Sequence, residues 1–145
     1  MTYLLDVNVL VALFDGSHVN HEAAHAWLGS TGRESWATCP LTENGCVRVL
    51  SNPSYPSLRA TPNDVMIRLA QFCAQNAHVF WADDVSLLTE LNAETRALLL
   101  GYQQLTDFYL AALARHHGGR LATFDGTLAR TLKKTMLDGT LELLR

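Results

Sequence analysis

The sequence predicts an α/β domain built on a mostly parallel sheet of about four to five short strands. Apolar segments that are typical of buried strands recur at residues 4–6, 36–38, 79–81, 121–124 and 141–144. Helical patterns separate them, which favours βαβ units with helices flanking the sheet. At 145 residues the chain has the size of one domain, so we expect a single domain over residues 1–145.

Most of the expected helices begin at a residue that suits a helix start. Asp6 or Asn8 can cap the helix after the first strand, and Pro40 fits the first turn of a later helix. We expect Gly29 to end the second helix. The expected helices cover residues 7–14, 21–28, 40–50, 61–73, 108–114 and 127–134, with residues 105–107 leading into the fifth and two short helices within 86–100.

The composition is that of an ordinary globular chain, with 48% apolar and 17% charged residues. A net charge of -3 gives no general attraction to nucleic acid or to an anionic membrane. The first apolar run is interrupted by Asp6 and Asn8 and follows no basic segment, so we expect no signal peptide and no membrane span. Cys39, Cys46 and Cys73 have no C-x-x-C spacing, which favours a reduced, cytoplasmic setting.

Asp6 interrupts the apolar run between Tyr3 and Phe14. An unpaired carboxylate out of water is costly, so Asp6 needs a specific partner. Asp6 and Asp125 both fall at the predicted carboxyl ends of strands. Sites in open parallel sheets form at this edge, which makes both acids candidate site residues.

Two more acids are candidates, and each also has a purely structural explanation. Glu43 shares a helix face with Cys46 and Leu50, which points it inward. A Glu in the first turn is also favoured by the helix dipole alone. Asp107 can simply cap the buried helix that follows it, and Asp125 can be the Asp of an Asp-Gly turn.

The four acids together favour a metal site. Each lies at the first turn of a predicted helix or the end of a predicted strand, and none has an adjacent Lys or Arg. Clustered carboxylates repel one another unless a cation joins them. Ligands that are all oxygen favour hard ions, so we expect Mg²⁺ or Mn²⁺.

Several short blocks of the chain carry a resemblance to a known family. They are Leu4–Asn8, Leu41–Glu43, Arg48–Pro53, Thr106–Ala114 and Leu121–Asp125. In this order and spacing they resemble the PIN-domain ribonucleases, particularly the VapC-type toxins of prokaryotic toxin-antitoxin modules. The resemblance runs nearly end to end and implies a PIN-like three-layer fold.

The resemblance also implies the site residues. The positions of the family's catalytic, metal-binding quartet are occupied by Asp6, Glu43, Asp107 and Asp125. Asn8 and Thr123 match positions where the family often keeps a polar group near the metal, which fits an orienting role. Thr127 stands where related sequences carry a further acid, which weakens the expectation of a second metal ion.

For activity, the resemblance implies endonucleolytic hydrolysis of RNA that depends on Mg²⁺ or Mn²⁺. Water attacks phosphorus in line and leaves 5'-phosphate and 3'-hydroxyl ends. Transfer RNA, ribosomal RNA and mRNA are all compatible substrates. The expected partners are a cognate antitoxin protein and a second copy of the chain in a homodimer.

Basic residues near the acids are candidates for contacts with RNA phosphates. Arg130, Lys133 and Lys134 have helical spacing just beyond the last acid. Arg115 and Arg120 flank the loop before the preceding strand. The alternative for each of them is an ordinary solvated helix face.

A zinc peptidase is one alternative function. His21, Glu22 and His25 spell H-E-x-x-H, in which two His one turn apart chelate Zn²⁺ and the Glu activates water. The continuation lacks a nearby third ligand, which leaves only the distant Glu34 or Glu43.

Two further alternatives concern the first strand and the fold. The segment Asp6-Val7-Asn8 half resembles phosphatases with a nucleophilic Asp at a strand end, although Asn8 replaces their second acid. A PIN-fold interaction module is the other alternative, since such a module binds RNA or protein without cutting.

Overall fold

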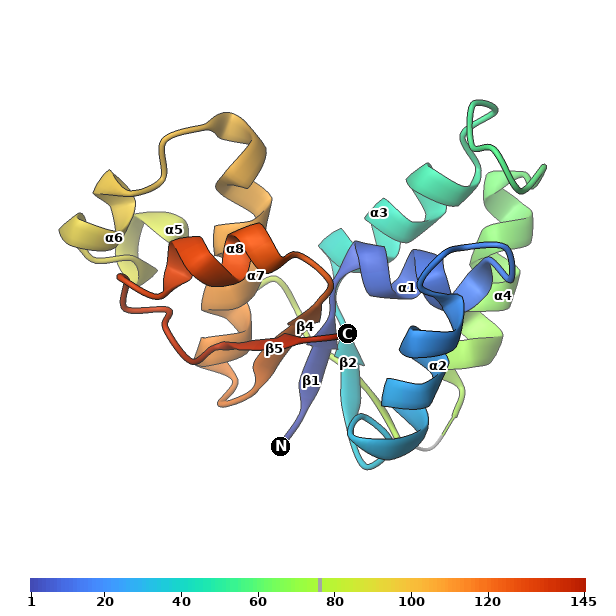
Figure 1. Cartoon of the computed structure of the whole chain (residues 1–145), viewed down its shortest axis with the longest axis horizontal. Coiled ribbons are helices and arrows are strands. Elements are labelled where there is room, and N and C mark those ends of the chain that lie inside the picture. Colours follow the sequence, from blue (N-terminus) through green and yellow to red (C-terminus); the bar gives the residue numbers. More distant parts are fainter. Residues whose placement is uncertain (76) are drawn as a thin grey trace.

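The computed structural model describes residues 1–75 and 77–145, and this part of the chain forms a five-stranded, all-parallel sheet (Figure 1). The strands are β1 Tyr3–Leu5, β2 Trp36–Thr38, β3 His78–Phe80, β4 Arg120–Thr123 and β5 Leu141–Leu143. Their order is β3-β2-β1-β4-β5, so β1 is the central strand. The predicted α/β fold with a parallel sheet is confirmed.

Helices connect the strands in the way the alternating pattern predicts. They are α1 Val7–Phe14, α2 His21–Ser30, α3 Pro40–Leu50, α4 Pro62–Cys73, α5 Leu87–Glu90, α6 Ala93–Ala97, the 3-10 helix η1 Tyr102–Gln104, α7 Leu105–His116 and α8 Gly126–Leu132. Within the described residues, none of these helices combines the length and the apolar character that crossing a bilayer requires.

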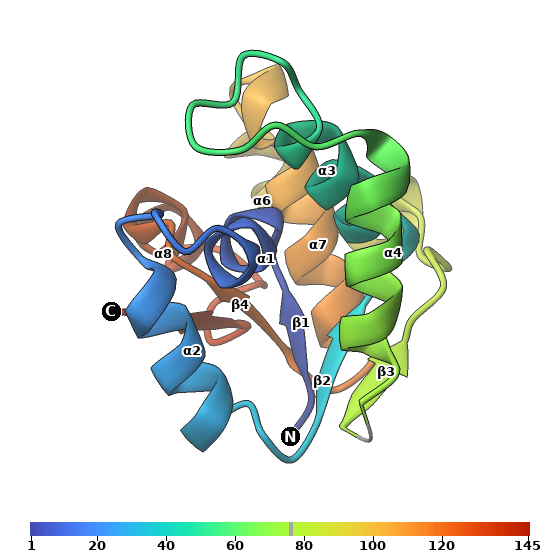
Figure 2. The ribbon, with the colours of Figure 1, turned by 90° about the vertical axis from the view of Figure 1, so that its right-hand side faces the viewer.

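The helices form a layer on each side of the sheet (Figures 1 and 2). Leu4 and Leu121 pack into a core cluster with α7 and α8. Their neighbours Leu5 and Ala122 pack into a second cluster with α1 to α4. Successive residues of a strand point to opposite faces, so the apolar, two-sided strands bury both faces and produce the three layers.

Some predicted boundaries were wrong by one or two residues. The first strand ends at Leu5 because Asp6 already caps α1. Helix α2 continues through Gly29 to Ser30. Among the described glycines only Gly118 and Gly139 have positive φ. Gly29 therefore stays helical and does not form the left-handed turn that commonly ends a helix.

The topology gathers the starts of three helices at one edge of the sheet. Helices α1, α3 and α8 each begin within three residues of the end of the preceding strand, β1, β2 or β4. A Cβ on Gly45 would lie 2.6 Å from Val7 Cγ2. The absence of a side chain at Gly45 thus lets α3 pack directly on the first turn of α1.

Candidate active site

Asp6 is buried at the junction of β1 and α1. Its side chain is only 6% exposed. Asp6 Oδ1 accepts a hydrogen bond from the Val7 backbone N–H at 2.7 Å, and Oδ2 accepts one from Thr123 Oγ1 at 2.7 Å. Pairing of Leu5 with Ala122 in the parallel ladder brings Thr123 beside Asp6. The predicted need of Asp6 for a specific partner is therefore met, in part, by a hydroxyl.

Thr123 also connects Asp6 to the start of α8. Its Oγ1 accepts hydrogen bonds from the Asp125 backbone N–H and from Asn8 Nδ2, both at 3.1 Å. Asn8 Oδ1 in turn accepts from the Phe124 N–H at 3.3 Å. Asn8 and Thr123 thus tie β4 to α1 and set the separation between Asp6 and Asp125.

Asp125 and Asp107 complete an acidic group around Asp6. Asp125 caps α8, since its Oδ1 accepts from the Leu128 N–H at 3.0 Å. Asp107 lies in the first turn of α7 and is half-buried. Burial, followed by the charges of Asp6 and Asp125, raises the pKa of Asp107 from 3.8 to about 6. We call Asp6, Asp107 and Asp125 the carboxylate cluster.

The carboxylate cluster has the chemistry of a site for a hard cation. Burial raises the pKa of Asp6 against the hydrogen bonds from Thr123 and Val7, and the charge of Asp125 raises it further. None of the ion pairs formed by the described residues involves the cluster. Its side-chain donors are all carboxylate oxygens, which suits Mg²⁺ or Mn²⁺, and Asp107 and Asp125 are partly exposed to solvent.

The fourth predicted acid, Glu43, has other partners. It lies in the first turn of α3 and accepts a hydrogen bond from Thr38 Oγ1 to Oε2 at 2.6 Å. Thr38 Oγ1 is also 2.7 Å from His78 Nε2. The ligand atoms of Glu43, Cys73 and His78 lie within 4.8 Å of one another. We call these three residues the mixed-ligand cluster.

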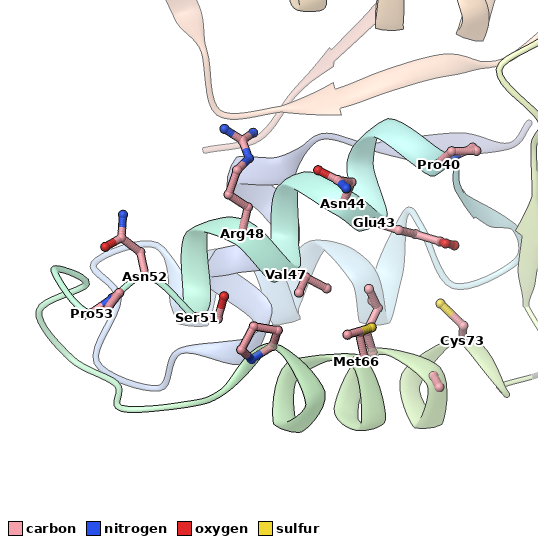
Figure 3. Close-up of a pocket in the computed structure, with 13 residues that line it drawn as sticks. Pro40, Glu43, Asn44, Val47, Arg48, Ser51, Asn52, Pro53, Met66 and Cys73 are labelled. Carbon is pink, nitrogen blue, oxygen red and sulfur yellow. The ribbon is translucent and has the colours of Figure 1, made fainter.

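In the structure the charges of Asp6 and Asp125 act on Asp107, whereas Glu43 is turned toward α4. Among the described residues, the mixed-ligand cluster alone has its ligand atoms within 4.8 Å of one another. Glu43 leaves α3 on the side that faces Cys73, while Arg48 points away from this side (Figure 3). Cys46 and Leu50, on the helix face predicted for Glu43, are buried. The inward orientation was thus predicted correctly, but the helix packs that face against α4. Membership of Glu43 in a four-acid site stays a prediction.

The predicted RNA-contacting residues lie on the surface, and they differ in whether their side chains already have partners. Arg115 and Arg120 are 3.9 and 3.8 Å from the carboxylates of Glu90 and Glu142. Arg130 Nη2 donates to Thr127 Oγ1 at 3.1 Å. A Cβ on Gly126 would lie 3.7 Å from Arg130 Nη1, so this guanidinium folds back over the first turn of α8, next to Asp125.

Lys133 and Lys134 follow α8 and are exposed. Their side chains make no hydrogen bond or ion pair with other described residues. They remain available for phosphate contacts, as does Arg130.

The H-E-x-x-H segment stabilises the end of α1. The Nδ1 atom of His21 lies 2.7 Å from the Ala12 carbonyl oxygen, and His25 Nε2 lies 2.9 Å from that of Leu13. These are among the last carbonyls of a helix, which lack partners within it. The described residues bring no third ligand to the two histidines. The peptidase hypothesis is therefore wrong, because the imidazoles serve the helix end.

Sequence reasoning missed a buried acid at the other end of α1. Asp15 is 2% exposed, and its Oδ2 accepts from the Tyr55 hydroxyl at 2.6 Å. Burial raises the pKa of Asp15, but hydrogen bonds from Tyr55, Ser17 and Ser57 outweigh it and lower the pKa overall. The contact anchors the loop after α3. The sequence feature that could have indicated this buried acid is its position at the end of the same apolar run that contains Asp6.

Sequence reasoning also missed the mixed-ligand cluster. Cys73 was placed on an amphipathic helix and His78 just before a strand, with Glu43 a long way earlier in the chain. Metal motifs are found by characteristic short ligand spacings; Cys73 and His78 are near each other in the sequence, but Glu43 is far from both. Their proximity follows only from packing α4 and β3 against α3 and β2.

The fold and the site define a class of protein, an α/β domain with an acidic cluster at the carboxyl edge of a parallel sheet. The model of the PIN domain matches residues 3–134. Ribonuclease VapC39 of Mycobacterium tuberculosis is 44% identical over 129 residues, covering 89% of this chain and 92% of the relative. Ribonuclease VapC38 of the same organism is 43% identical over 138 residues, covering 93% and 95%. The chain belongs to the PIN-domain family and, within it, to the VapC ribonucleases.

A solved structure agrees with the fold. The crystal structure of Mycobacterium tuberculosis VapC20, a toxin described as cleaving the sarcin-ricin loop, aligns over 100% of both chains with a TM-score of 0.65. The two sequences are only 13% identical, so this likeness concerns the architecture alone.

Proposed function

We propose that this protein is a metal-dependent endoribonuclease and the toxin of a toxin-antitoxin pair. The observation that carries the proposal is the carboxylate cluster, in which the Thr123 hydroxyl bonds both the Asp6 carboxylate and the Asp125 backbone N–H, and the charges of Asp6 and Asp125 raise the pKa of Asp107. The relatives that share more than two fifths of the sequence are named ribonucleases, which supports RNA as the substrate.

The carboxylate cluster would hold the divalent ion, either Mg²⁺ or Mn²⁺. When bound, the ion lowers the pKa of a bound water, offsets phosphate charge and stabilises the leaving oxygen. Thr123 and Asn8 keep Asp6 and Asp125 in fixed orientations, because each of their polar groups already has a partner. The half-buried Asp107 forms the side of the site that faces water.

Glu43 is proposed as the fourth acid. Its helix packs at Gly45 on Val7, the residue that directly follows Asp6. To approach the carboxylate cluster, its carboxylate has to leave Thr38. Because Glu43 is only partly buried beside a groove, such a change of rotamer needs no repacking of the core.

RNA phosphates are proposed to contact Arg130, Lys133 and Lys134. Arg130 has the strongest support, because its guanidinium lies over the first turn of α8 beside Asp125. Arg115 and Arg120, which are near acidic groups, are proposed as weaker contacts. A cognate antitoxin and a homodimer complete the proposal, and both rest on membership of the family.

The Asp6→Asn variant tests the proposal. We expect it to fold and to cleave RNA at least about 100-fold more slowly with Mg²⁺ or Mn²⁺, because the variant loses a charged ligand of the ion that stabilises the transition state. Asp15→Asn is a matched control, since Asp15 is also buried and borders the same helix at its other end. This control should retain the cleavage rate. Wild-type cleavage by Asp6→Asn would rule out the proposed site.

A further inference from the structure

We propose that Glu43, Cys73 and His78 form a second metal site, which binds Zn²⁺ and is separate from the carboxylate cluster. The three residues come from α3, the end of α4 and the start of β3. Their ligand atoms lie within 4.8 Å of one another. They therefore converge from three different elements on one point between the α3–α4 pair and the edge of the sheet.

The spacing is close to what a zinc ion requires. With Zn–S of about 2.3 Å and Zn–N or Zn–O of about 2.0 Å, tetrahedral ligand atoms lie roughly 3.3–3.6 Å apart. The present separations are within 4.8 Å, so closing the site takes side-chain movements of about 1 Å. Side-chain rotation in a cluster that is only partly buried supplies this movement without shifting α3 or α4.

Aromatic contacts hold two of the ligands in place. The ring of His78 lies 4.6 Å from the ring of Trp36, which is 1% exposed. Phe72, next to Cys73, stacks on the same Trp36 ring at 4.6 Å. Trp36 therefore fixes the position of the His78 imidazole relative to the end of α4, before any ion binds.

Thr38 holds the remaining ligand and the imidazole at once. Its hydroxyl donates to Glu43 Oε2 at 2.6 Å and lies 2.7 Å from His78 Nε2. The hydroxyl has only one proton, so it accepts from the imidazole N–H. Thr38 itself is fully buried. The cluster is thus a connected polar group in which an ion would replace the hydroxyl as the common partner.

The donor set selects the kind of ion. A carboxylate, a thiolate and an imidazole offer oxygen, sulfur and nitrogen ligands, a combination that suits Zn²⁺ and that Mg²⁺ disfavours. The carboxylate and the thiolate together carry two negative charges and balance a divalent ion. Three protein ligands leave a fourth position for water.

The site is accessible from solvent through a groove. Glu43 and Cys73 line a cavity of about 970 Å³ between α3 and α4, whose lining also includes Val47 and Met66. Figure 3 shows the Glu43 carboxylate and the Cys73 sulfur at the same end of this groove. An ion can therefore enter, and the fourth ligand position has room for water.

One of the three proposed zinc ligands, Glu43, is also proposed as the fourth acid of the ribonuclease site. A Zn²⁺ ion on the mixed-ligand cluster holds Glu43 on the α4 side, away from the carboxylate cluster. This consequence rests on the proposed function, whereas binding of Zn²⁺ does not. If both hold, Zn²⁺ slows RNA cleavage in the presence of Mg²⁺.

Cobalt titration of the metal-free, full-length protein tests the site, because Co²⁺ occupies zinc sites and shows an intense absorption when a thiolate is a ligand. We expect this absorption in the wild type and its loss in Cys73→Ser. We expect His78→Ala to bind Zn²⁺ more than about 100-fold more weakly, since even outer partners of a metal site contribute about 10- to 100-fold.

Control variants separate the cluster from other thiols and imidazoles. Cys46→Ala removes a fully buried thiol and His116→Ala an exposed imidazole, both outside the cluster. Both variants should keep the absorption. A wild type without thiolate absorption, or absorption that survives in Cys73→Ser, would overturn the inference.

The Asp6→Asn variant distinguishes this inference from the proposed function. Asp6 is not part of the mixed-ligand cluster, so the variant should keep the thiolate absorption whether or not it cleaves RNA. Retained cleavage with normal absorption contradicts the ribonuclease site alone. Lost cleavage with no absorption in either protein contradicts the zinc site alone.

Discussion

Two groups of side chains follow neighbouring strands of one sheet but offer different chemistry. The carboxylate cluster lies after β1 and β4 and presents only oxygen, held by the hydroxyl of Thr123. The mixed-ligand cluster lies between β2, β3 and α4 and presents oxygen, nitrogen and sulfur, held by the hydroxyl of Thr38. In each group one buried threonine joins an acid to a partner from another element.

The two proposals together would let one parallel sheet hold two ions of different kinds. Hard oxygen ligands favour Mg²⁺ or Mn²⁺, and a thiolate with an imidazole favours Zn²⁺. Glu43 connects the two groups, because it is bound in one and proposed for the other. A substitution of Glu43 therefore affects both groups at once.

The largest expected effect comes from Asp107→Asn. Cleavage should fall by about 100- to 1000-fold, as for the loss of one group that stabilises the transition state. In EDTA the same variant should have a higher Tm than the wild type, because repulsion from Asp6 and Asp125 is removed. Rate assays with Mg²⁺ and thermal unfolding check both expectations. A lower Tm in EDTA would show that Asp107 has a favourable partner instead.

Glu43→Gln should have the next largest effect. We expect cleavage to fall by about 10- to 100-fold, as for an outer partner of a metal site, and zinc affinity to fall as well. His78→Ala is the matched control, since it removes a ligand of the mixed-ligand cluster alone and should keep the Mg²⁺-dependent rate. If Glu43→Gln cleaves as fast as the wild type, Glu43 belongs only to the mixed-ligand cluster.

The two threonines should differ in their contribution to stability. Thr123→Val leaves the Oδ2 atom of the buried Asp6 without its hydrogen bond, while Oδ1 keeps the bond from the Val7 N–H, and this loss should cost about 1–3 kcal/mol. Thr38→Val should cost only about 0.5–1.5 kcal/mol, because the Glu43 carboxylate borders a groove and can turn to water. Urea unfolding of both variants measures the difference. Equal costs would show that the two clusters are equally enclosed.

The smallest expected effect is on the pH dependence of stability without metal. The pKa of Asp107 is raised from 3.8 to about 6 in the folded protein, so the folded state binds more protons than the unfolded state in this interval. Its contribution is complete below pH 3.8 and is lost as pH rises through about 6. Urea unfolding in EDTA should show this decline, and Asp107→Asn should reduce it. A rise over the interval would contradict the assignment.

Much of the fold was predictable because it depends on local patterns. Short apolar strands alternating with helices specify parallel βαβ units, and residues such as Asp6 and Thr61 mark helix starts through their caps. These patterns also placed Asp6, Asp107 and Asp125 at strand ends or first helical turns, where the structure has them. The end of α2 shows the limit of such local patterns. Gly29 does not adopt the positive φ that commonly ends a helix, and α2 continues to Ser30.

The partners of side chains were less predictable. The sequence alone determined that acids would lie at the carboxyl edge of a parallel sheet, since spacing and periodicity decide where each element begins. Only the tertiary structure decided that Glu43 faces Cys73 and His78, and that His21 and His25 serve the end of α1. The reason is that a side chain takes the nearest suitable partner, and the packing of the elements decides which partner is near, whatever its distance along the chain.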